Sequence, residues 1–586
     1  MNILGISGVE GAVPFARAQA PGLDEREYRM AQGFDAAAVL VMDGQVVAGV
    51  AEERIDRKKH SAAFPKGAIA SCLSQAGITL EDVDELAHAF DYDPYRAMYA
   101  LDPISSELYR DVYSREALLL QARKYLPGFP ENRILHVDHH QAHAASALYT
   151  SGWSDGLVVV VDGLGEAHGA TVHEATNGQL HRLLRVSARD SIGILYSLVT
   201  FHLGFDFNAD EYKIMGLAPY GDPDRFRAFF EREVRLLPDG GIEIPLLHLN
   251  KTPEDRRRYR TSRQVLCSQL GPDRDPDEAI TERDRDVAAA LQETLDRVML
   301  HICGHAAQVT KARRLALAGG VALNCTANGK LLASGLFDDV YVQPASGDDG
   351  AALGAALHQA QVHGEVRNQR MAVPFLGPAP SSTDIEGALK AFAEHISVRS
   401  FDSLGETCQV AAQLIAAGRV VAWYRGRMEF GPRALGHRSI LADPAHPEMR
   451  DRINAMVKMR EAFRPFAPAV TVEQVDTYFD VPAGSELPYM IMVVPVREPH
   501  RAELPAVTHV DGSARVQTVS AKDNHDFHVL LRAVGQVTGR EMVLNTSFNV
   551  KGQPIVNTPQ EAIDTFLNTG IDYLFLENAL ISRRGD

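Results

Sequence analysis

The chain contains two histidines whose spacing suits metal binding. His139 and His143 are four residues apart and directly follow Asp138, a residue type that caps helix N-termini. In an α-helix, residues at this spacing share one face with Cβ atoms about 5–6 Å apart, so both imidazoles could bind one metal ion. The same spacing also occurs in helices whose histidines are exposed or form hydrogen bonds in a core. Other features must therefore decide between these interpretations.

Two aspartates at glycine-rich turns favour the metal interpretation. Residues 157–161 are Leu-Val-Val-Val-Val, which predicts a buried strand that leads Asp162 into a turn with Gly163 and Gly165. In α/β folds, this edge of a sheet binds phosphates and metals. Asp348 lies in another glycine-flanked turn, before a helix of small residues. With the two histidines, the aspartates would form a site suited to iron(II), manganese or zinc.

A second pair of histidines has the same spacing. His301 and His305 lie in a long amphipathic helix predicted over residues 285–311, with no glycine turn or aspartate-bearing strand end nearby in the sequence. We interpret this pair as structural.

Glycine-rich turns indicate adenine-nucleotide binding, although each of them could also be purely structural. A strand predicted at 315–318 runs into a glycine turn whose backbone could approach a ribose or phosphate, and an asparagine there could cap the next helix. The turn after Asp162 could hold a phosphate, and a lysine beside a further predicted tight turn offers a cation. The candidate nucleotide-binding residues are Gly163, Gly165, Lys213, Gly216, Gly319, Gly320 and Asn324.

Arginines concentrate among Gly, Pro and Phe over residues 425–439, and Lys458 and Arg464 follow closely. Guanidinium groups bind planar or tetrahedral oxyanions in a bidentate manner. Because acidic residues do not alternate with these arginines, we predict a pocket for a small phosphorylated or carboxylated molecule rather than a set of surface arginines. Arg515 and residues 545–549 are plausible further donors.

Composition limits the remaining possibilities. With 586 residues, of which 45% are apolar, the chain should form two or more domains. No run is apolar enough to span a membrane and the N-terminus reads as a strand, so we expect a cytoplasmic protein without a membrane partner. The formal charge of −17 disfavours nucleic acid. We interpret the basic cluster at 256–263 as a solvated helix face or loop.

Alternating strand and helix patterns predict an α/β protein. A strand at the N-terminus, a hairpin over residues 35–53 that turns at Asp43–Gly44, and a second cycle from residue 157 are similar to the ribonuclease-H-like halves of actin- and sugar-kinase-type ATPases. A segment rich in Pro and Gly near residue 370 predicts a linker. We therefore divide the chain into domains 1–372 and 373–586.

Ten motifs in this order, over nearly the whole chain, resemble those of the O-carbamoyltransferases, a family that includes the tobramycin, cephamycin and nodulation-factor enzymes. They are Asp35-Ala-Ala-Ala, Glu52-Glu53-Arg54, Arg57-Lys-Lys-His60, His139-His-Gln-Ala-His143, Val161-Asp-Gly163, Met215-Gly-Leu217, Gly319-Gly-Val321, Gly431-Pro-Arg-Ala-Leu-Gly436, Arg464-Pro-Phe-Ala-Pro468 and Leu544-Asn-Thr-Ser-Phe-Asn549. The resemblance implies an N-terminal actin-like ATPase domain of duplicated ribonuclease-H-like halves, similar to tRNA threonylcarbamoyl-transfer proteins, and a C-terminal YrdC-like α/β domain.

The resemblance also implies a reaction. Enzymes of this family use carbamoyl phosphate and ATP to form carbamoyl-adenylate, and they pass the carbamoyl group to a hydroxyl of a small acceptor. The residues that match the family's metal ligands, typically for iron, are His139, His143, Asp162 and Asp348. The residues that match its carbamoyl-phosphate contacts are Arg433, Lys458, Arg464, Arg515 and Ser547.

One position departs from the family pattern. The residue before Asp35 is usually histidine in the family, whereas this chain has Phe34 after an insertion at residues 9–33. Asp35 and His60 are therefore the candidate catalytic residues that could replace the missing imidazole, unless the metal and nucleotide alone activate the hydroxyl. Phe34 could instead pack against an aromatic acceptor.

Two other functions have to be weighed. A tRNA threonylcarbamoyl-type transferase would share both domain types but would call for a basic surface, which the net charge disfavours. A non-catalytic nucleotide-binding regulatory protein would not explain the second, arginine-rich pocket. The sequence leaves the acceptor and the oligomeric state open.

Overall fold

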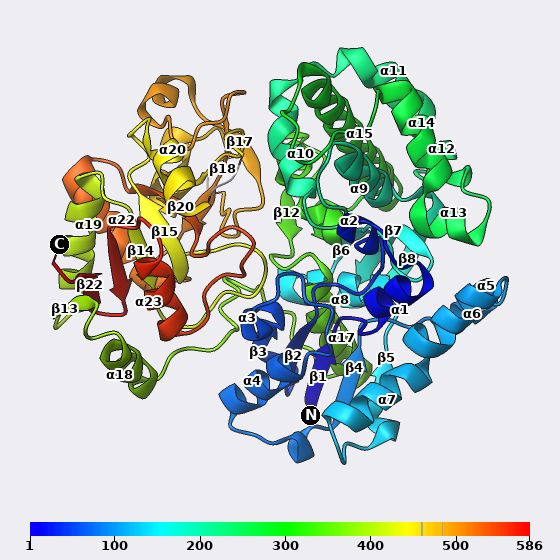
Figure 1. The fold of residues 1–586 in the computed structure, drawn as a ribbon, viewed down its shortest axis with the longest axis horizontal. Coiled ribbons are helices and arrows are strands. Elements are labelled where there is room, and N and C mark those ends of the chain that lie inside the picture. The colour runs from blue at the N-terminus through cyan, green and yellow to red at the C-terminus, as the bar shows by residue number, and fades with distance from the viewer. Residues whose placement is uncertain (459–460, 483–484, 586) are drawn as a thin grey trace. The chain divides into compact units, whose positions relative to one another are not determined.

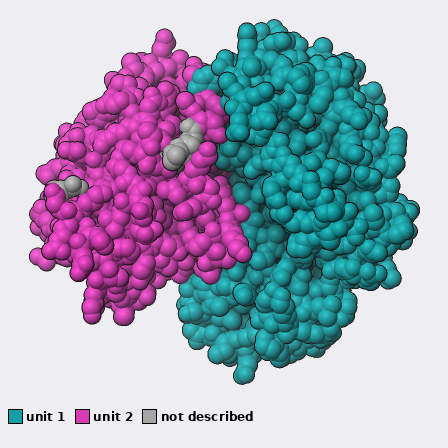
Figure 2. Space-filling model, viewed as in Figure 1, with its two compact units in different colours: residues 1–52, 60–371 teal, residues 53–59, 372–586 magenta. Residues whose placement is uncertain are grey.

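The computed structural model describes residues 1–458, 461–482 and 485–585. It divides into two compact units, residues 1–52 with 60–371 and residues 53–59 with 372–586 (Figure 2). The boundary between residues 371 and 372 is one residue before the division indicated by the sequence. The sequence did not indicate that residues 53–59 belong to the second unit.

Unit 1 contains two five-stranded sheets of the same topology. The orders are β3-β2-β1-β4-β5 and β8-β7-β6-β11-β12. In each sheet the first three strands along the chain pair antiparallel and the last two extend the sheet in parallel. The strands are β1 Asn2–Ile6, β2 Ala37–Met42, β3 Gln45–Ala51, β4 Glu85–His88, β5 Ile134–His136, β6 Gly156–Val161, β7 His168–Thr176, β8 Gln179–Ser187, β11 Arg314–Ala318 and β12 Asp339–Val342. This repetition confirms the predicted α/β class with its duplicated ribonuclease-H-like halves.

The predicted hairpin is confirmed between β2 and β3. Its two-residue turn consists of Asp43 and Gly44, with φ of 48° and 74°. A type I′ turn requires positive φ at both central residues, which is why an Asp-Gly pair between alternating apolar residues predicts this hairpin.

Two helices of small residues pack closely inside unit 1. They are α8 His139–Ser151 and α17 Asp348–Val362, which lie side by side (Figure 1). Helix α17 packs against the first sheet and α8 against the second. A Cβ on Gly354 would lie 1.7 Å from the carbonyl oxygen of Ala142, so only glycine permits this approach. The close packing brings the first turns of both helices, and the polar residues in them, to one place.

The long helix predicted from residue 285 is α15 Glu282–Thr310, which begins three residues earlier than predicted. Thr281 and Asp284 form a capping box at its N-terminus. His301 Nε2 contacts the carbonyl oxygen of Gly241 at 3.2 Å, and His305 lies against Gly240. These contacts agree with a structural role for both histidines.

Further helices complete unit 1. They are α1 Ala12–Gln19, α2 Glu25–Tyr28, α4 Lys66–Ala76, α5 Arg96–Tyr99, α6 Pro103–Leu108, α7 Arg115–Tyr125, α9 Ile192–His202, α10 Glu211–Leu217, α11 Asp224–Glu233, α12 Pro245–His248, α13 Pro253–Arg258, α14 Arg260–Leu270 and α16 Cys325–Ala333. A short pair, β9 Arg235–Leu236 and β10 Ile242–Glu243, lies between α11 and α12.

The basic cluster at 256–263 holds the insertion at residues 9–33 in place. Arg258 and Arg263 pair with Glu27 of α2 at 3.3 and 2.9 Å, and the Arg263 guanidinium lies over the ring of Phe201. Both arginine side chains are less than a quarter exposed. The interpretation of this cluster as a solvated face is therefore wrong for these two arginines, because the insertion supplies a carboxylate partner distant in sequence.

Unit 2 is built on a mixed eight-stranded sheet of order β13-β22-β21-β14-β15-β20-β16-β19. The strands are β13 Ile396–Ser400, β14 Val421–Tyr424, β15 Arg438–Ala442, β16 Ala467–Thr471, β19 Gln517–Val519, β20 Met542–Ser547, β21 Tyr573–Leu576 and β22 Ala579–Arg583, with a separate pair β17 Val493–Pro495 and β18 Ser513–Arg515. The helices are α3 Glu53–Asp56, α18 Ser382–Ala391, α19 Leu404–Ala416, α20 Met449–Ile453, α21 Val475–Tyr478, α22 His525–Thr538 and α23 Pro559–Leu567.

The core of unit 2 lies between its sheet and two amphipathic helices. Apolar residues of α19 and α22 cluster with buried residues of the strands, among them Trp423 and Phe575.

In residues 1–458, 461–482 and 485–585, no helix combines the length and the apolar character needed to cross a bilayer.

Candidate active site

Helix α8 begins as the sequence predicts. Asp138 Oδ1 accepts a hydrogen bond from the backbone N–H of Gln141 at 2.9 Å, which caps the helix. His139 and His143 are fully buried on its first turns, and their Nε2 atoms lie 3.1 Å apart. Two imidazole nitrogens thus point to one place in the interior.

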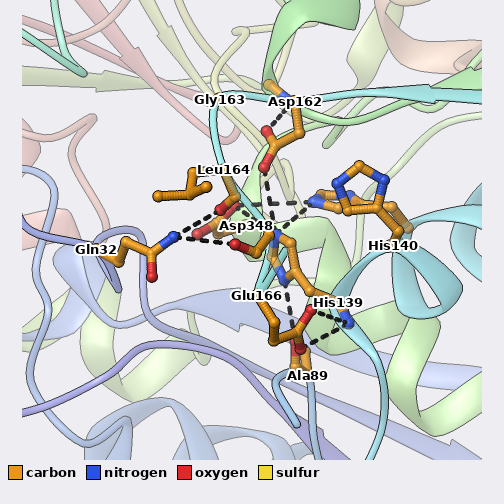
Figure 3. A network of polar contacts seen from close by, with 12 residues as sticks. Gln32, Ala89, His139, His140, Asp162, Gly163, Leu164, Glu166 and Asp348 are labelled. Atoms are coloured by element: carbon orange, nitrogen blue, oxygen red, sulfur yellow. Dashed lines mark hydrogen bonds and ion pairs between the residues drawn. The ribbon is translucent and has the colours of Figure 1, made fainter. Parts of the chain in front are cut away.

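Two carboxylates meet the histidines there. Asp162, directly after β6, has Oδ2 at 3.4 Å from His139 Nε2. Asp348, the first residue of α17, has Oδ1 at 3.4 Å from His139 Nε2 and 3.8 Å from His143 Nε2. One ligand atom from each of the four residues lies within 4.8 Å of the others. Figure 3 shows Asp162, Asp348 and Glu166 gathered around His139.

The four residues fit a divalent cation. His139 Nδ1 is 3.0 Å from the carbonyl oxygen of Ala89, so this nitrogen donates to the backbone and Nε2 faces the carboxylates. Burial lowers the pKa of His139, but the charges of Asp348 and Asp162 outweigh burial and hold the pKa well above its usual value. Burial would raise the pKa of Asp162, whereas the hydrogen bond from His139 holds it well below its usual range. A field that favours positive charge so strongly also favours a metal ion.

Glu166 is a residue of this centre that sequence reasoning missed. Its Oε1 accepts hydrogen bonds from the backbone N–H groups of His139 at 3.0 Å and Asp91 at 2.7 Å. Burial raises the pKa of Glu166 to about 7. Its position four residues after Asp162, in the same glycine turn, was the available signal. Through this hydrogen bond, Glu166 fixes the backbone of His139, the first residue of α8, and thereby the position of its imidazole ring.

The glycine turn after β11 lies against the same centre. Gly319 has φ of 92°, and a Cβ there would lie 2.3 Å from the carbonyl oxygen of Val161. The N–H of Gly320 donates to Asp162 Oδ1 at 2.8 Å. Asn324 caps α16 by accepting from the N–H of Ala327 at 3.0 Å. The candidate nucleotide turn and a candidate metal ligand are therefore joined directly.

The other candidate glycines differ in their surroundings. A Cβ on Gly163 would meet open space, whereas a Cβ on Gly165 would lie 2.6 Å from the ring of His140. Packing alone therefore accounts for Gly165, and only Gly163 has room beside it for a ligand.

A polar network behind Asn324 was not predicted. Asn324 Nδ2 donates to Gln292 Oε1 at 2.9 Å, and Gln292 Nε2 donates to Asp296 Oδ1 at 2.8 Å. Asp296 is buried and pairs with Lys330 at 2.6 Å. Burial raises the pKa of Asp296 despite this lysine. The i, i+4 spacing of Gln292 and Asp296 on the polar face of α15 was the only signal in the sequence.

The tight turn predicted at Lys213 and Gly216 is wrong. Both residues lie within helix α10, and Lys213 Nζ pairs with Asp210 Oδ2 at 2.8 Å. The apolar residues around Gly216 continue the helix, which tolerates a single glycine. Their role in nucleotide binding stays a prediction.

The two candidate catalytic residues lie together. His60 Nδ1 contacts Asp35 Oδ1 at 2.8 Å, and both residues have positive φ, 55° and 56°. Phe34 is 7% exposed, and the Arg29 guanidinium lies 4.9 Å from the centre of its ring. Arg29 also donates to the carbonyl oxygen of Phe207 at 3.2 Å. Phe34 thus anchors the insertion, and a contact with the acceptor stays a prediction.

In unit 2, the candidate carbamoyl-phosphate residues come to one edge of the sheet. Ser547 is the last residue of β20, opposite Ser439 of β15. Arg464 precedes β16, which runs antiparallel to β20, and Arg515 precedes β19, which is parallel to β16. Arg433 lies in the loop that leads into β15. The side chain of Lys458 lies outside the described part of the chain.

Neutral and acidic side chains hold the loop of Arg433. Asn545 Nδ2 donates to the carbonyl oxygen of Ala434 at 3.2 Å, and Gln517 Nε2 donates to that of Leu435 at 2.9 Å. Buried Glu429 accepts from the N–H groups of Leu435, His437 and Arg438 at 2.9, 2.9 and 3.1 Å. Sequence reasoning missed Glu429 and Gln517, because neither stands in a recognisable pattern.

Not every arginine of the cluster serves a pocket. Arg438 is fully buried, with its guanidinium 3.6 Å from the centre of the Tyr424 ring. It donates to the carbonyl oxygens of Arg425 at 2.7 Å and Gly426 at 3.0 Å. Arg425 in turn pairs with Asp526 at 2.5 Å. These two arginines hold the fold together.

Comparison with known proteins agrees with both units. The family model described as "Carbamoyltransferase N-terminus" matches residues 31–357, and the one described as "Carbamoyltransferase C-terminus" matches residues 412–583. The nodulation protein NolNO of Sinorhizobium fredii is 41% identical over 555 residues, which cover 94% of this chain and 79% of that protein. The 3'-hydroxymethylcephem-O-carbamoyltransferase of Streptomyces clavuligerus is 32% identical over 355 residues, 60% of this chain and 61% of the relative.

A solved structure of full-length HypF in the phosphate- and nucleotide-bound form covers 62% of this chain and 55% of its own. Its identity of 12% and TM-score of 0.30 are too low to support an argument. The two family models and the relatives confirm the resemblance that the motifs carry: this chain belongs to the carbamoyltransferase family and is a transferase.

Proposed function

We propose that this protein is an ATP-dependent O-carbamoyltransferase that forms carbamoyl-adenylate from carbamoyl phosphate and ATP and transfers the carbamoyl group to a hydroxyl of a small natural product. The observation that carries the proposal is the direct hydrogen bond from the Gly320 N–H to Asp162 Oδ1, which joins a nucleotide-type turn to a four-residue metal centre. The proposed reaction requires both a nucleotide site and a metal site. The proposed reaction requires no nucleic acid and no membrane, in keeping with the net charge of −17.

The first half of the reaction belongs to the arginine-rich edge of unit 2. Arg433, Arg464 and Arg515 bind carbamoyl phosphate and stabilise the charge that develops as water displaces phosphate and leaves carbamate. A carbamate oxygen then attacks the α-phosphorus of ATP and expels pyrophosphate, which yields carbamoyl-adenylate. The turn at Gly163, which has open space beside it, offers a backbone N–H group for a phosphate of the nucleotide, and the Gly320 N–H holds Asp162 beside that turn.

In the second half, the acceptor hydroxyl oxygen attacks the carbamoyl carbon and AMP leaves. His60 takes the proton of the hydroxyl, and Asp35 at 2.8 Å from Nδ1 fixes the tautomer and orientation of the ring. His139, His143, Asp162 and Asp348 would hold a divalent metal, expected to be iron(II), which supplies a Lewis acid for phosphate and hydroxyl oxygens.

Pyrophosphate release tests the proposal. Purified protein is incubated with ATP, with and without carbamoyl phosphate and with no acceptor present. We expect pyrophosphate only when both substrates are added. A tRNA threonylcarbamoyl-type transferase would not depend on carbamoyl phosphate, and a regulatory nucleotide-binding protein would bind ATP without releasing pyrophosphate. Hydroxylated natural products are then screened by mass spectrometry for the gain of a carbamoyl group.

A further inference from the structure

Unit 1 contains a second group of potential metal ligands, which none of the steps above uses. It consists of His202, the last residue of α9, Cys267 on α14, and Asp273 in the loop after α14. One ring nitrogen, the sulfur and one carboxylate oxygen lie within 4.8 Å of one another. Helix α14 packs against α9, so two helices and a loop meet at this point.

The three ligand atoms are arranged around Asp273. Its Oδ1 is 2.6 Å from His202 Nδ1 and 3.2 Å from Cys267 Sγ. Metal bonds of about 2.0–2.3 Å in a tetrahedral site place the ligand atoms about 3.3–3.5 Å apart. An ion therefore fits once these two distances increase by roughly 1 Å or less, as it replaces the hydrogens that lie between the atoms.

The backbone holds these side chains in position. The N–H of Arg274 donates to the carbonyl oxygen of His202 at 3.0 Å, and Arg274 Nε donates to that of Leu203 at 2.7 Å. These two hydrogen bonds fix the loop that carries Asp273 against the end of α9. His202 Nε2 is buried with no hydrogen-bond partner among the described residues, whereas Nδ1 faces Asp273.

The donor set selects the metal. Zinc binds thiolate sulfur, imidazole nitrogen and carboxylate oxygen, whereas Mg²⁺ and Ca²⁺ prefer oxygen alone. The Asp273 side chain is 38% exposed, so a water molecule can take the fourth tetrahedral position. Arg263 Nη2 lies 3.9 Å from Asp273 Oδ2, but its charge is already paired with Glu27 at 2.9 Å.

The carboxylate is ionised and the thiol is protonated when no metal is bound. Burial would raise the pKa of Asp273, but the hydrogen bonds from His202 and Cys267 lower it. Burial, and then the hydrogen bond to Asp273, raise the pKa of Cys267. A metal has to displace the thiol proton, so its binding strengthens as the pH rises.

We propose that His202, Cys267 and Asp273 bind a zinc ion through Nδ1, Sγ and Oδ1, with water as the fourth ligand. On binding, the thiol proton passes to the solvent and the imidazole hydrogen moves from Nδ1 to Nε2. The ion links α9 to α14 one helical turn after Arg263, which pairs with Glu27 of the insertion. Zinc therefore braces the surface that holds the insertion. This site does not depend on the proposed reaction.

Cobalt(II), which can replace zinc in tetrahedral sites, tests the proposal by absorption. A thiolate ligand gives a sulfur-to-cobalt charge-transfer band in the near ultraviolet, and the candidate metal centre around His139 contains no cysteine. We expect this band when cobalt chloride is added to the reduced, full-length protein after dialysis against a chelator, and we expect added zinc to remove it. If wild-type protein shows no band, hydrogen bonds alone join the three side chains and the proposal is wrong.

Two substitutions keep the hydrogen bonds and remove the metal ligands. In Cys267→Ser the hydroxyl can still donate to Asp273, and in Asp273→Asn the amide oxygen can still accept. Cys267→Ser should abolish the band. Asp273→Asn should weaken cobalt binding at least about tenfold, since even residues behind metal ligands change affinity by about 10–100-fold.

Cys303→Ala is the matched control. It removes a thiol of α15 that belongs to no group of potential ligands among the described residues, and it should leave the band unchanged. A band of full intensity in Cys267→Ser would place the thiolate elsewhere and contradict the proposal.

Protection of the thiol is a second measurement that requires no variant. Of the five cysteines, Cys267 is the one that is not buried, so iodoacetamide reaches it first in the folded protein. Zinc should slow alkylation of Cys267 at least about tenfold, because a metal-bound thiolate is not free to react, and magnesium should have no effect. Mass spectrometry of the peptide that contains Cys267 measures the rate. Equal rates with and without zinc contradict the proposal, even if the substituted proteins do not fold.

Discussion

The candidate metal centre of unit 1 and the arginine-rich edge of unit 2 are built in different ways. In unit 1, four residues from distant parts of the sequence converge, and among the described residues only the two histidines pair with their carboxylates. In unit 2, a dense run of arginines divides, and Arg425 and Arg438 are already engaged with Asp526 and with backbone carbonyl oxygens. Position at strand and helix ends therefore identified a centre more reliably than local enrichment in one residue type.

The largest expected effect concerns the metal centre. We expect His143→Ala or Asp348→Ala to remove the metal and to lower carbamoyl transfer by more than about a hundredfold, since even residues behind the ligands change affinity by 10–100-fold. Consumption of carbamoyl phosphate should persist, because its candidate contacts lie in unit 2. Metal analysis and both activities of the purified variants provide the measurement. His301→Ala is the control, and full metal content in His143→Ala would remove this residue from the site.

Unit 1 also contains a buried histidine whose pKa is shifted in the opposite direction to that of His139. His173 on β7 is fully buried, and neither ring nitrogen has a hydrogen-bond partner among the described residues. Burial lowers the pKa of His173 to about 4. The unfolded chain, with a pKa near 6.5, binds this proton more readily. Above pH 6.5 the ring is neutral in both states, and its titration costs no stability. As the pH falls from 6.5 toward 4, the unfolded chain takes up a proton that the folded chain does not, so the free energy of unfolding decreases.

We expect His173→Phe to reduce the loss of unfolding free energy between pH 6.5 and 4 by up to about 3 kcal/mol, the equivalent of the pKa difference. Denaturant unfolding at several pH values measures it. His181→Phe on β8 replaces an exposed histidine of the neighbouring strand and serves as the control. An identical pH dependence in wild type and His173→Phe would show that this ring is not neutral through burial.

For the arginine edge, Arg433→Ala and Arg464→Ala should each weaken carbamoyl phosphate by about ten- to a hundredfold, since a charge-assisted hydrogen bond contributes about 1.5–3 kcal/mol. Lysine should rescue poorly because it lacks the planar fork. Titration with carbamoyl phosphate measures the affinity. If the affinity for carbamoyl phosphate is unchanged in both variants, Arg433 and Arg464 stabilise the fold, as Arg438 does, and do not bind this substrate.

The sequence predicted the elements of unit 1 well because local signals coincide there. The Asp43–Gly44 turn, the Asp138 cap and the strand before Asp162 each combine a periodic pattern with a residue type that fits one backbone conformation. The convergence of His143 and Asp348 followed from where strands and helices end in an α/β fold.

The rest depends on contacts between residues far apart in the sequence. Glu166 acts on His139 through a backbone N–H, and Glu27 neutralises Arg258 and Arg263 from another segment. No periodicity records such pairings. Gly216 misled because a glycine within a helix and a glycine in a turn look alike in a single sequence.

The smallest expected effect concerns Phe34, which connects the insertion to the site. The ring is buried beneath the Arg29 guanidinium, and that arginine is tied to the carbonyl oxygen of Phe207. Removing the ring loosens the insertion and leaves the glycine turns for the nucleotide intact. Phe34→Ala should therefore raise the acceptor KM by about three- to tenfold, the equivalent of a contact of about 0.5–1.5 kcal/mol, with a smaller effect on carbamoyl-adenylate formation. Phe34→Leu keeps apolar volume but not the ring face, and it should fall between alanine and wild type. Pyrophosphate release without acceptor is compared with transfer over a range of acceptor concentrations. If both rates fall equally, Phe34 supports the nucleotide site or the fold, and the insertion does not shape acceptor binding through this residue.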